Sequence, residues 1–296
     1  MRFELDKSDP FYPPSLKETE EPPSKLWVSG ERESLNEGYR IAIVGSRKPT
    51  RYGEKVAYDL AYELALRRII VVSGLAYGID RQAHEGALAA GGKTIAVLGC
   101  GLDYPYPKKN LDLKERIANA GAVLSEFSPE TAAISPHFPR RNRIISALSL
   151  GVIVVEAAVR SGALSTTAWG LSQGKEIFAV PGNITSPLSA GTNRLIQNGA
   201  TPVLQVEDVL EALSLSHLVP HLKERQNFSP EEKIVEVLGE IGEASVDEIR
   251  GKTGLPISQL TALLVSLEIC GKIAQLPGGR LLSLNHRRRH RRSENI

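Results

Sequence analysis

The stretch IAIVGSRKPTRYGEKVAYDLAYELALRRIIVVSG, residues 41–74, decides the fold of this chain. A short apolar run stands at each end, and the segment between them has apolar residues at helical spacing, which place Val56, Leu60, Ala61 and Leu64 on one face. Neither apolar run alternates with polar residues, as a strand with one face in water would. We therefore expect two strands covered on both faces, joined by a helix and parallel to each other.

The same alternation continues to about residue 213. Further apolar runs, separated by segments of helical periodicity, occupy 94–99, 122–127, 151–157, 176–182 and 201–205. This pattern predicts an α/β fold, a Rossmann-like doubly wound domain over residues 40–213 with a mostly parallel sheet and helices on both faces. Ligands of such domains bind beyond the carboxyl ends of the strands, where loops lead into helix N-termini.

The loops after the predicted strands are rich in glycine, hydroxyl groups and positive charge. They are GSRKPTRYG at 45–53, GLAYGID at 74–80, HFPRRNRIIS at 137–146, RSGALSTTA at 160–168 and PGNITSPLSAGTN at 181–193. Because the carboxyl ends of parallel strands meet at one edge of the sheet, all five loops are expected at that edge. Loops of this kind are typical of phosphate binding.

The loop at 137–146 carries three arginines, Arg140, Arg141 and Arg143, directly before an apolar helical run at 144–150. Cations at a helix N-terminus oppose the helix dipole unless an anion compensates, so the loop predicts an anion site, most simply for a phosphate chain. The alternative is a solvated helix start, or an ion pair with Glu126 or Glu156.

Phe138, in the same loop, offers a stacking surface for a nucleobase. The alternative for this side chain is a place in the local core under the loop. Asn142 is compatible with a contact to the ligand and equally with a hydrogen bond that holds the loop.

Composition and charge narrow the function classes. No run of about 18 apolar residues is present, and the N-terminus MRFELDKSDP lacks the apolar core of a secretion signal, so a cytoplasmic protein is expected. The net charge of +2 comes from the last eleven residues, because residues 1–285 carry 31 basic and 33 acidic side chains, a net charge of −2. Any nucleic-acid site in the body of the chain must therefore come from local clustering.

Metal ions, disulfides and the common cofactors are not expected. Cys100 and Cys270 are isolated, and we interpret both as buried apolar residues. His84 and His137 have no metal-binding spacing. Gly45-Ser46-Arg47 replaces the dinucleotide fingerprint GxGxxG, which argues against a nicotinamide or flavin cofactor.

Two residues of the loop at 74–80 have competing interpretations. Gly74 permits a tight turn, the close approach of a phosphate, or both. For Asp80 a cap on the following helix is the favoured interpretation.

Taken together and in this order, the motifs resemble the DNA-processing protein DprA family, also called Smf. The segments that carry the resemblance are GSR at 45–47, SGLAYGID at 73–80, HFPRRNRIIS at 137–146, VVEAAVRSGALSTTAWGLSQGKEIFAVPG at 154–182 and SAGTNRLIQNGA at 189–200. The resemblance implies a homodimeric single-stranded DNA-binding protein without catalytic activity. It implies a role in protecting incoming DNA and loading the RecA recombinase during natural transformation.

By the same resemblance, the DNA contacts fall on the matching motif positions, which are Arg47, Ser73, Gly74, Phe138, Arg141, Asn142, Arg143, Ser161 and Lys175. Arg140 occupies a variable position of the motif.

The alternative function is a nucleotide-binding or nucleotide-cleaving enzyme, a phosphoribohydrolase of the lysine-decarboxylase-like type. Those enzymes place a catalytic glutamate shortly after a glycine-rich loop, whereas residues 157–175 of this chain contain no Asp or Glu. Without a carboxylate there, the hydrolase chemistry has no acid or base.

The two ends of the chain differ from the α/β region. Residues 1–39 are proline-rich and predict an extended segment with a short strand at 26–28. Residues 214–229 are expected to be a linker, 230–285 a winged-helix domain, and 286–296 a disordered basic tail. Many members of the family carry a helical domain before the proline-rich segment, where this sequence has about ten residues.

In the predicted winged helix, three short helices precede a hairpin around Pro277-Gly278-Gly279. The helix at 256–270, in the position that usually reads the major groove, contains no Lys or Arg. Contacts with a protein are therefore favoured over groove reading for this domain.

Overall fold

The computed structural model describes residues 1–219, 230–276 and 279–283. The chain divides into two compact units, residues 1–221 and 222–296, each of which is described by itself. Most of the linker expected at 214–229 and the whole basic tail at 286–296 lie outside the described residues.

The first unit is built on a nine-stranded sheet with the order β1-β2-β6-β5-β4-β3-β7-β8-β9. All seven apolar runs form strands, and these seven strands lie parallel to one another, as predicted: β3 Arg40–Val44, β4 Ile70–Ser73, β5 Thr94–Leu98, β6 Ala122–Ser125, β7 Gly151–Val154, β8 Glu176–Ala179 and β9 Thr201–Pro202. The strand order reverses at β3, between β4 and β7, which is where doubly wound folds form their binding crevice.

The N-terminal segment continues this sheet. β2 (Lys25–Gly30) includes the strand predicted at 26–28 and pairs antiparallel with β6, and β1 (Arg2–Asp6) pairs antiparallel with β2. β1 was not predicted, because Leu5 is its only buried side chain and the run shows no clear apolar pattern.

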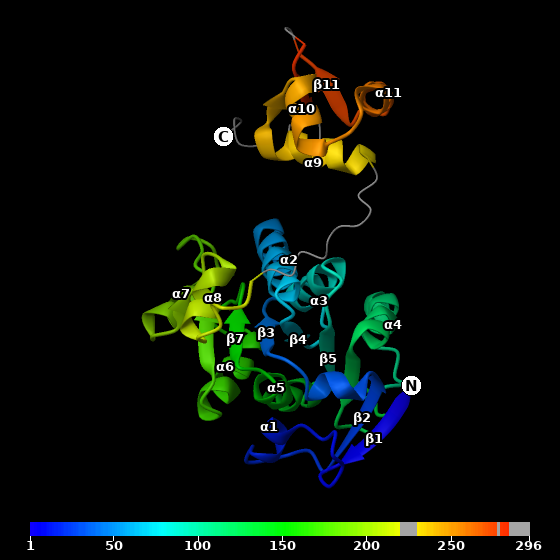
Figure 1. Ribbon diagram of the computed structural model, residues 1–296. Helices are drawn as coiled ribbons and strands as arrows, with labels where there is room; N and C mark the ends of the chain where they lie inside the picture. Colours follow the sequence, from blue (N-terminus) through cyan, green and yellow to red (C-terminus); the bar gives the residue numbers. More distant parts are fainter. Residues whose placement is uncertain (220–229, 277–278, 284–296) are drawn as a thin grey trace. The chain divides into compact units, whose positions relative to one another are not determined.

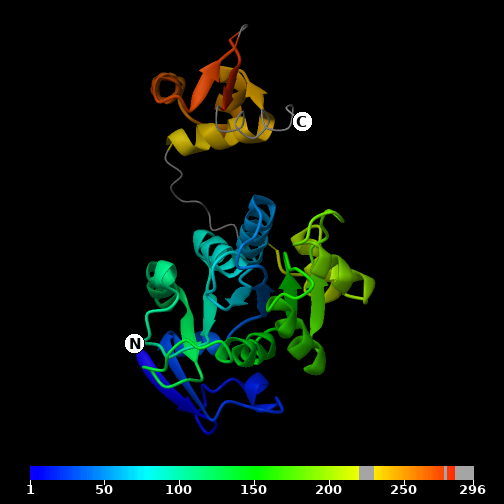
Figure 2. The ribbon, with the colours of Figure 1, turned by 180° about the vertical axis from the view of Figure 1, so that it is seen from behind.

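Helices cover both faces of the sheet (Figure 1 and Figure 2). The helices of the first unit are α1 Pro14–Lys17, α2 Arg51–Leu66, α3 Ile79–Ala89, α4 Leu111–Ala120, α5 His137–Ala147, α6 Ala163–Ser172, α7 Ala190–Gln197 and α8 Val206–Ala212, with 3₁₀ turns η1 Arg32–Leu35 and η2 Lys108–Asn110. One apolar core joins the sheet to α2, α3 and α8, and another joins its opposite face to α1 and α5. The doubly wound architecture is therefore confirmed.

The second unit is a small helical domain with a three-stranded antiparallel sheet, in the order β10-β12-β11. Its elements are α9 Pro230–Ile241, β10 Glu243–Ala244, α10 Val246–Thr253, α11 Ile257–Ile269, β11 Ile273–Gln275 and β12 Leu281–Ser283. The second unit has its own apolar core, in which Leu260, Leu264 and Leu267 of α11 are buried. This arrangement confirms the predicted winged helix.

The two cysteines have different surroundings, so the prediction that both are buried is half wrong. Cys100 is buried, but Cys270 is exposed because it follows the last turn of α11 on the outer side of a small domain. Among the described residues, no helix has the length and apolar character needed to cross a membrane. The described residues also contain no cluster of three or more His, Cys, Asp or Glu that could hold a metal ion.

His84 on α3 is fully buried and neutral. Its Nδ1 lies 2.7 Å from the hydroxyl oxygen of Thr94, and that hydroxyl donates its proton to the carbonyl of Val71. Nδ1–H is therefore the donor, and Nε2 has no partner among the described residues. Burial lowers the pKa of His84 to about 3.

This histidine predicts an acid-sensitive fold. Between about pH 6.5 and pH 3 the unfolded chain binds a proton at His84 that the folded chain does not, so the free energy of unfolding falls as pH falls. The loss is expected to approach about 1.4 kcal/mol per pH unit in this range. The free energy of unfolding can be measured by urea denaturation at several pH values. It should change less with pH for His84→Gln than for the native chain.

Candidate functional site

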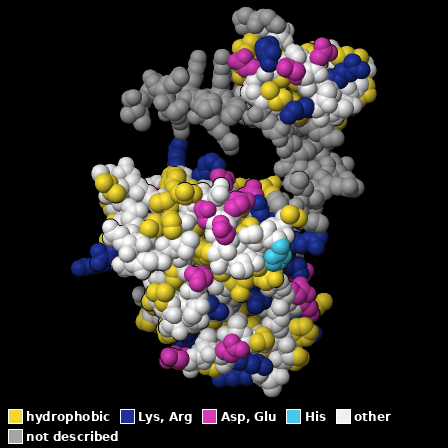
Figure 3. All heavy atoms as spheres, turned by 60° about the vertical axis from the view of Figure 1, so that its left-hand side comes forward, with side chains coloured by type: hydrophobic (Ala, Val, Ile, Leu, Met, Phe, Trp, Pro, Cys, Tyr) yellow, Lys and Arg dark blue, Asp and Glu magenta, His cyan; other side chains and the backbone are white. Residues whose placement is uncertain are grey.

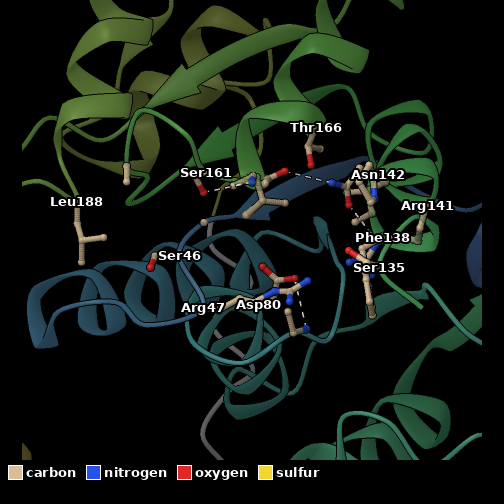
Figure 4. Close-up of a pocket in the computed structure, with 18 residues that line it drawn as sticks. Ser46, Arg47, Asp80, Ser135, Phe138, Arg141, Asn142, Ser161, Thr166 and Leu188 are labelled. Atoms are coloured by element: carbon tan, nitrogen blue, oxygen red, sulfur yellow. Dashed lines mark hydrogen bonds between the residues drawn. The ribbon is translucent and has the colours of Figure 1, made fainter. Parts of the chain in front are cut away.

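A cavity of about 630 Å³ lies at the carboxyl ends of the central strands. Its lining comes from the loop after β3, the start of α3, α5, and the loop after β7 with the start of α6. Figure 4 shows Arg47 and Asp80 on one side of this cavity, Ser161 and Thr166 on the opposite side, and Phe138 with Asn142 at a third side. The edge of the sheet that the sequence predicted is thus where the cavity forms.

The helix that carries the arginines begins earlier than the sequence suggested. α5 starts at His137 instead of Ile144, because Pro139 falls in its first turn, where no backbone N–H is needed for the helical ladder. Arg140, Arg141 and Arg143 therefore lie inside the helix. The argument that they oppose the dipole at its N-terminus was wrong, since the dipole acts within the first turn.

Arg141 forms part of the floor of the cavity and is 4% exposed. One of its terminal nitrogens, Nη1, donates to the carbonyl oxygens of Gly74, at 2.7 Å, and of Val97. Burial lowers the pKa of Arg141 to about 10, so the guanidinium remains charged at neutral pH. Gly74 makes this contact possible, because a Cβ there would lie 2.4 Å from the guanidinium nitrogens.

Asp80 supports the same floor and does not cap α3, so the favoured interpretation of a helix cap was wrong. The N-cap position is Gly78, with no side-chain cap, and Oδ2 of Asp80 accepts the N–H groups of Gly74 at 3.1 Å and Ala76 at 3.4 Å. The carboxylate therefore holds the loop between β4 and α3. Asp80 is the one acidic residue among those that line the described cavity.

Arg143 forms the ion pair that the sequence left as an alternative. Both of its terminal nitrogens donate to Glu126, each at 2.9 Å, and the two side chains are each 4% exposed. Arg140 reaches the same carboxylate at 3.1 Å from a largely exposed position. Glu156, the other suggested partner, instead accepts the N–H and the hydroxyl of Thr50 at the start of α2.

The mouth of the cavity holds a cation on an aromatic ring. The guanidinium carbon of exposed Arg47 lies 5.0 Å from the ring centroid of half-buried Phe138. The Phe138 ring also contacts the Tyr106 ring, with 5.5 Å between centroids. Phe138 therefore both packs locally and borders the cavity, so the two interpretations of its role coexist.

The side opposite Arg47 is the start of α6. Asn142 donates from Nδ2 to the hydroxyl of Ser165 at 2.7 Å and to the carbonyl of Gly162 at 3.3 Å. The hydroxyl oxygen of Ser161 accepts the N–H of Ala163 at 3.3 Å. Asn142 thus fixes the N-terminal turn of α6, and the positive end of this helix borders the cavity.

The nine residues predicted as contacts separate into three groups. Those that line the main cavity are Arg47, Phe138, Arg141, Asn142 and Ser161. Ser73 and Gly74 lie below it, and Ser73 is fully buried with its hydroxyl donated to the carbonyl of Ile43. Arg143 and Lys175 line a second cavity of about 240 Å³ together with Glu18, Glu20 and Glu21.

Besides Asp80, three polar residues that line the main cavity were not predicted as contacts: Ser46, Ser135 and Thr166. Ser46 and Thr166 stand inside motifs that the sequence singled out, so their hydroxyl groups at the strand ends were the available signal. Ser135 lies outside those motifs and has no signal of its own.

Comparison with known proteins shows the family of this chain. Residues 5–214 match the family of DNA recombination-mediator protein A, and residues 223–279 match the DprA winged helix domain. Protein Smf of Escherichia coli is 41% identical over 278 residues, which cover 91% of this chain and 74% of that protein.

Two relatives with solved structures share the fold. The structure of DNA processing protein A from Streptococcus pneumoniae superposes with a TM-score of 0.68 at 42% identity, over 71% of this chain and 73% of that one. The protein from Helicobacter pylori, whose structure concerns its single-stranded DNA binding mode, gives 0.66 at 32% identity, over 72% and 96%. The chain therefore belongs to the family of DNA recombination-mediator protein A.

Proposed function

We propose that this chain binds single-stranded DNA in the main cavity, without catalysis, and hands the strand to RecA in the cytoplasm. The observation that carries the proposal is the pairing of Arg47 with Phe138 at the mouth of the cavity. A cation beside an aromatic face matches the phosphate and the base of one nucleotide, and stacking on an aromatic side chain tolerates any base sequence. The structure of the Helicobacter pylori relative with its single-stranded DNA binding mode supports the same ligand class.

At the mouth and sides of the cavity, the direct contacts that we propose are Arg47, Phe138, Asn142 and Ser161, because these residues line it. Arg141, Gly74 and Ser73 form and support its floor. Arg143 neutralises Glu126 and acts on DNA only through the position of α5. Lys175, which lines the second cavity, is half-buried and is assigned to DNA by family resemblance alone.

Binding is confined to this edge of the sheet. On the face of the first unit shown in Figure 3, basic side chains are scattered among acidic and apolar ones and form no continuous basic surface. Residues 1–285 carry a net charge of −2 in spite of the +2 of the whole chain. Because only a few phosphates are contacted at such a local site, the affinity for DNA is expected to fall only modestly with rising salt concentration.

A nucleotide-cleaving enzyme is the less favoured function. Asp80, whose Oδ2 holds the loop between β4 and α3, is the one acid in the lining of the described cavity, and residues 157–175 contain no carboxylate where those enzymes carry their catalytic glutamate. Incubation of the pure protein with nucleoside monophosphates tests this directly. Release of free base would favour the enzyme, and its absence together with binding of single-stranded DNA would support our proposal.

Membership of the family supports two further parts of the proposal, the homodimer and the partner RecA. Sedimentation of the protein alone, then with RecA and single-stranded DNA, tests both. A monomer at all concentrations, or no effect on RecA filament formation, would contradict these parts without affecting DNA binding by the cavity.

Arg47→Gln is expected to weaken binding of oligo-dT by about fivefold, as loss of an exposed charge contact of about 1 kcal/mol predicts. It should also reduce the salt slope by about 0.7, the value for one neutralised phosphate on a single strand. The measurement is a titration of the native and variant proteins with oligo-dT and with duplex of equal length, over a salt series. Lys7→Gln, at an exposed lysine that follows the edge strand β1 and is not in the cavity lining, is the control. Equal affinity of the native protein for the duplex, or no change in Arg47→Gln, would contradict the proposed function.

A further inference from the structure

The floor of the main cavity presents a hydrogen-bond acceptor. Asp80 is 6% exposed and its Oδ2 accepts two backbone N–H groups, but Oδ1 receives no hydrogen bond from any described residue. Oδ1 is not one of the fully buried side-chain atoms that lack a hydrogen-bond partner, so it is not enclosed by protein atoms on all sides. Asp80 lines the cavity, so Oδ1 is the carboxylate oxygen that is left for a ligand there.

A donor lies in the same floor. Arg141 uses Nη1 for the carbonyl oxygens of Gly74 and Val97 and Nε for the side chain of Asn142. Its other terminal nitrogen, Nη2, makes no hydrogen bond to a described residue. Nη2 is also not among the fully buried atoms that lack a partner, so it is accessible. An acceptor and a charged donor, Asp80 and Arg141, are therefore both available to a ligand that enters the cavity.

A phosphate does not suit this floor. The carboxylate of Asp80 would repel it, and a buried carboxylate next to a second anion is among the costliest arrangements in a protein interior. Burial raises the pKa of Asp80, and Arg141, the two N–H groups and Arg47 offset part of that rise. The phosphates of a bound strand are thus expected at the mouth, near Arg47 and the start of α6, and a neutral group with N–H donors is expected at the floor.

We propose that the cavity floor reads the edge of one nucleobase, with Asp80 Oδ1 as the acceptor and Arg141 Nη2 as the donor, and that guanine is the preferred base. The Watson–Crick edge of guanine carries two adjacent donor positions, N1–H and the 2-amino group, next to the acceptor O6. Thymine offers a single N–H between two acceptors, so it leaves less for the carboxylate to bind. A cavity of about 630 Å³ is within the range of about 300–1,000 Å³ usual for small ligands, which leaves room for a nucleotide.

This inference rests on the proposed function and adds a base preference to a site that would otherwise be indifferent to sequence. The preference is confined to the one base that reaches the floor. Bases stacked elsewhere, including any that stack on Phe138, are read through their faces and contribute no selectivity.

The test compares short oligo-dT with the same oligonucleotide carrying one interior substitution by guanine, cytosine, adenine or hypoxanthine. Because the strand can shift along the site, a single substituted base is enough to reach the floor. We expect the native protein to bind the guanine oligonucleotide about tenfold more tightly than oligo-dT, as for one well-formed base contact. Hypoxanthine, which lacks only the 2-amino group of guanine, should fall between guanine and thymine.

Asp80→Asn is the matching variant, because an asparagine oxygen can still accept the N–H groups of Gly74 and Ala76. Its amide would then place a donor where Oδ1 stood, so we expect the preference for guanine over thymine, measured as the ratio of the two affinities, to be lost. Asp59→Asn, an exposed site on α2 away from this cavity, removes the same charge and should keep the preference. A thermal melt of each variant shows whether it is folded.

The outcomes separate the two proposals. Equal affinity of the native protein for all five oligonucleotides, with oligo-dT still bound, would overturn the base readout and leave the proposed function standing. A guanine preference that persists in folded Asp80→Asn would overturn the role of Asp80. Failure of the native protein to bind oligo-dT at all would contradict the proposed function itself. The comparison of guanine with hypoxanthine uses the native protein alone and so holds even where a variant does not fold.

Discussion

Replacing Glu126 with glutamine is expected to lower the free energy of unfolding by about 3–5 kcal/mol, the usual cost of breaking a buried ion pair. Glu126 and Arg143 are each 4% exposed at the side chain and meet through two hydrogen bonds of 2.9 Å. Glutamine keeps the size of the side chain but removes the charge, so Arg143 would be a buried cation without a counterion. Chemical denaturation at neutral pH measures the loss.

The matched control is Arg140→Gln, which removes the other partner of the same carboxylate. Arg140 lies 3.1 Å from Glu126, and its side chain is 59% exposed, so water screens the interaction and compensates its loss. We expect a change below about 1 kcal/mol. Equal losses in the two variants would show that burial does not set the energy of this cluster.

Replacing Phe138 with alanine is expected to weaken binding of single-stranded DNA by about 5- to 150-fold, the equivalent of about 1–3 kcal/mol for one stacked base. The ring borders the cavity beside Arg47, so its removal takes away both the stacking face and the surface on which the guanidinium rests. Fluorescence anisotropy with labelled oligo-dT at fixed salt measures the change.

Phe138→Leu separates stacking from packing. The ring fits against Tyr106 and against Gly99, where a Cβ would lie 2.8 Å from a ring carbon, so alanine also leaves a gap. Leucine fills much of that gap without an aromatic face. If leucine restored full affinity, Phe138 would act by packing, and the stacking role would be contradicted.

The sequence was informative about the sheet because each apolar run is short, uninterrupted and bounded by turn residues. The run at 151–157, for example, has no polar alternation, and its strand, β7, is buried at every position. The loops after such strands must meet at one edge whatever the details of packing. The sequence therefore predicts the edge of the sheet at which the glycine- and hydroxyl-rich loops meet and the cavity lies.

The site was less predictable at single residues. Ser73 belongs to a motif that looks like a ligand-binding loop, yet its hydroxyl donates a hydrogen bond to the carbonyl of Ile43 inside the sheet. Asp80 looks like a helix cap, yet its carboxylate turns back to the preceding loop. In both cases a polar side chain satisfies a backbone group that lies near it only after the chain has folded.

By itself, the sequence determined the parallel α/β domain, the edge where the loops converge and the winged helix, because the periodicity of apolar residues is a local property of the chain. Only the tertiary structure decided what each arginine of α5 does. Successive residues of a helix point about 100° apart, so Arg141 and Arg143 face directions about 200° apart. Arg141 reaches the cavity floor and Arg143 meets Glu126, which lies on a different segment, after β6. Neighbours in the motif thus differ in function because their side chains meet different partners.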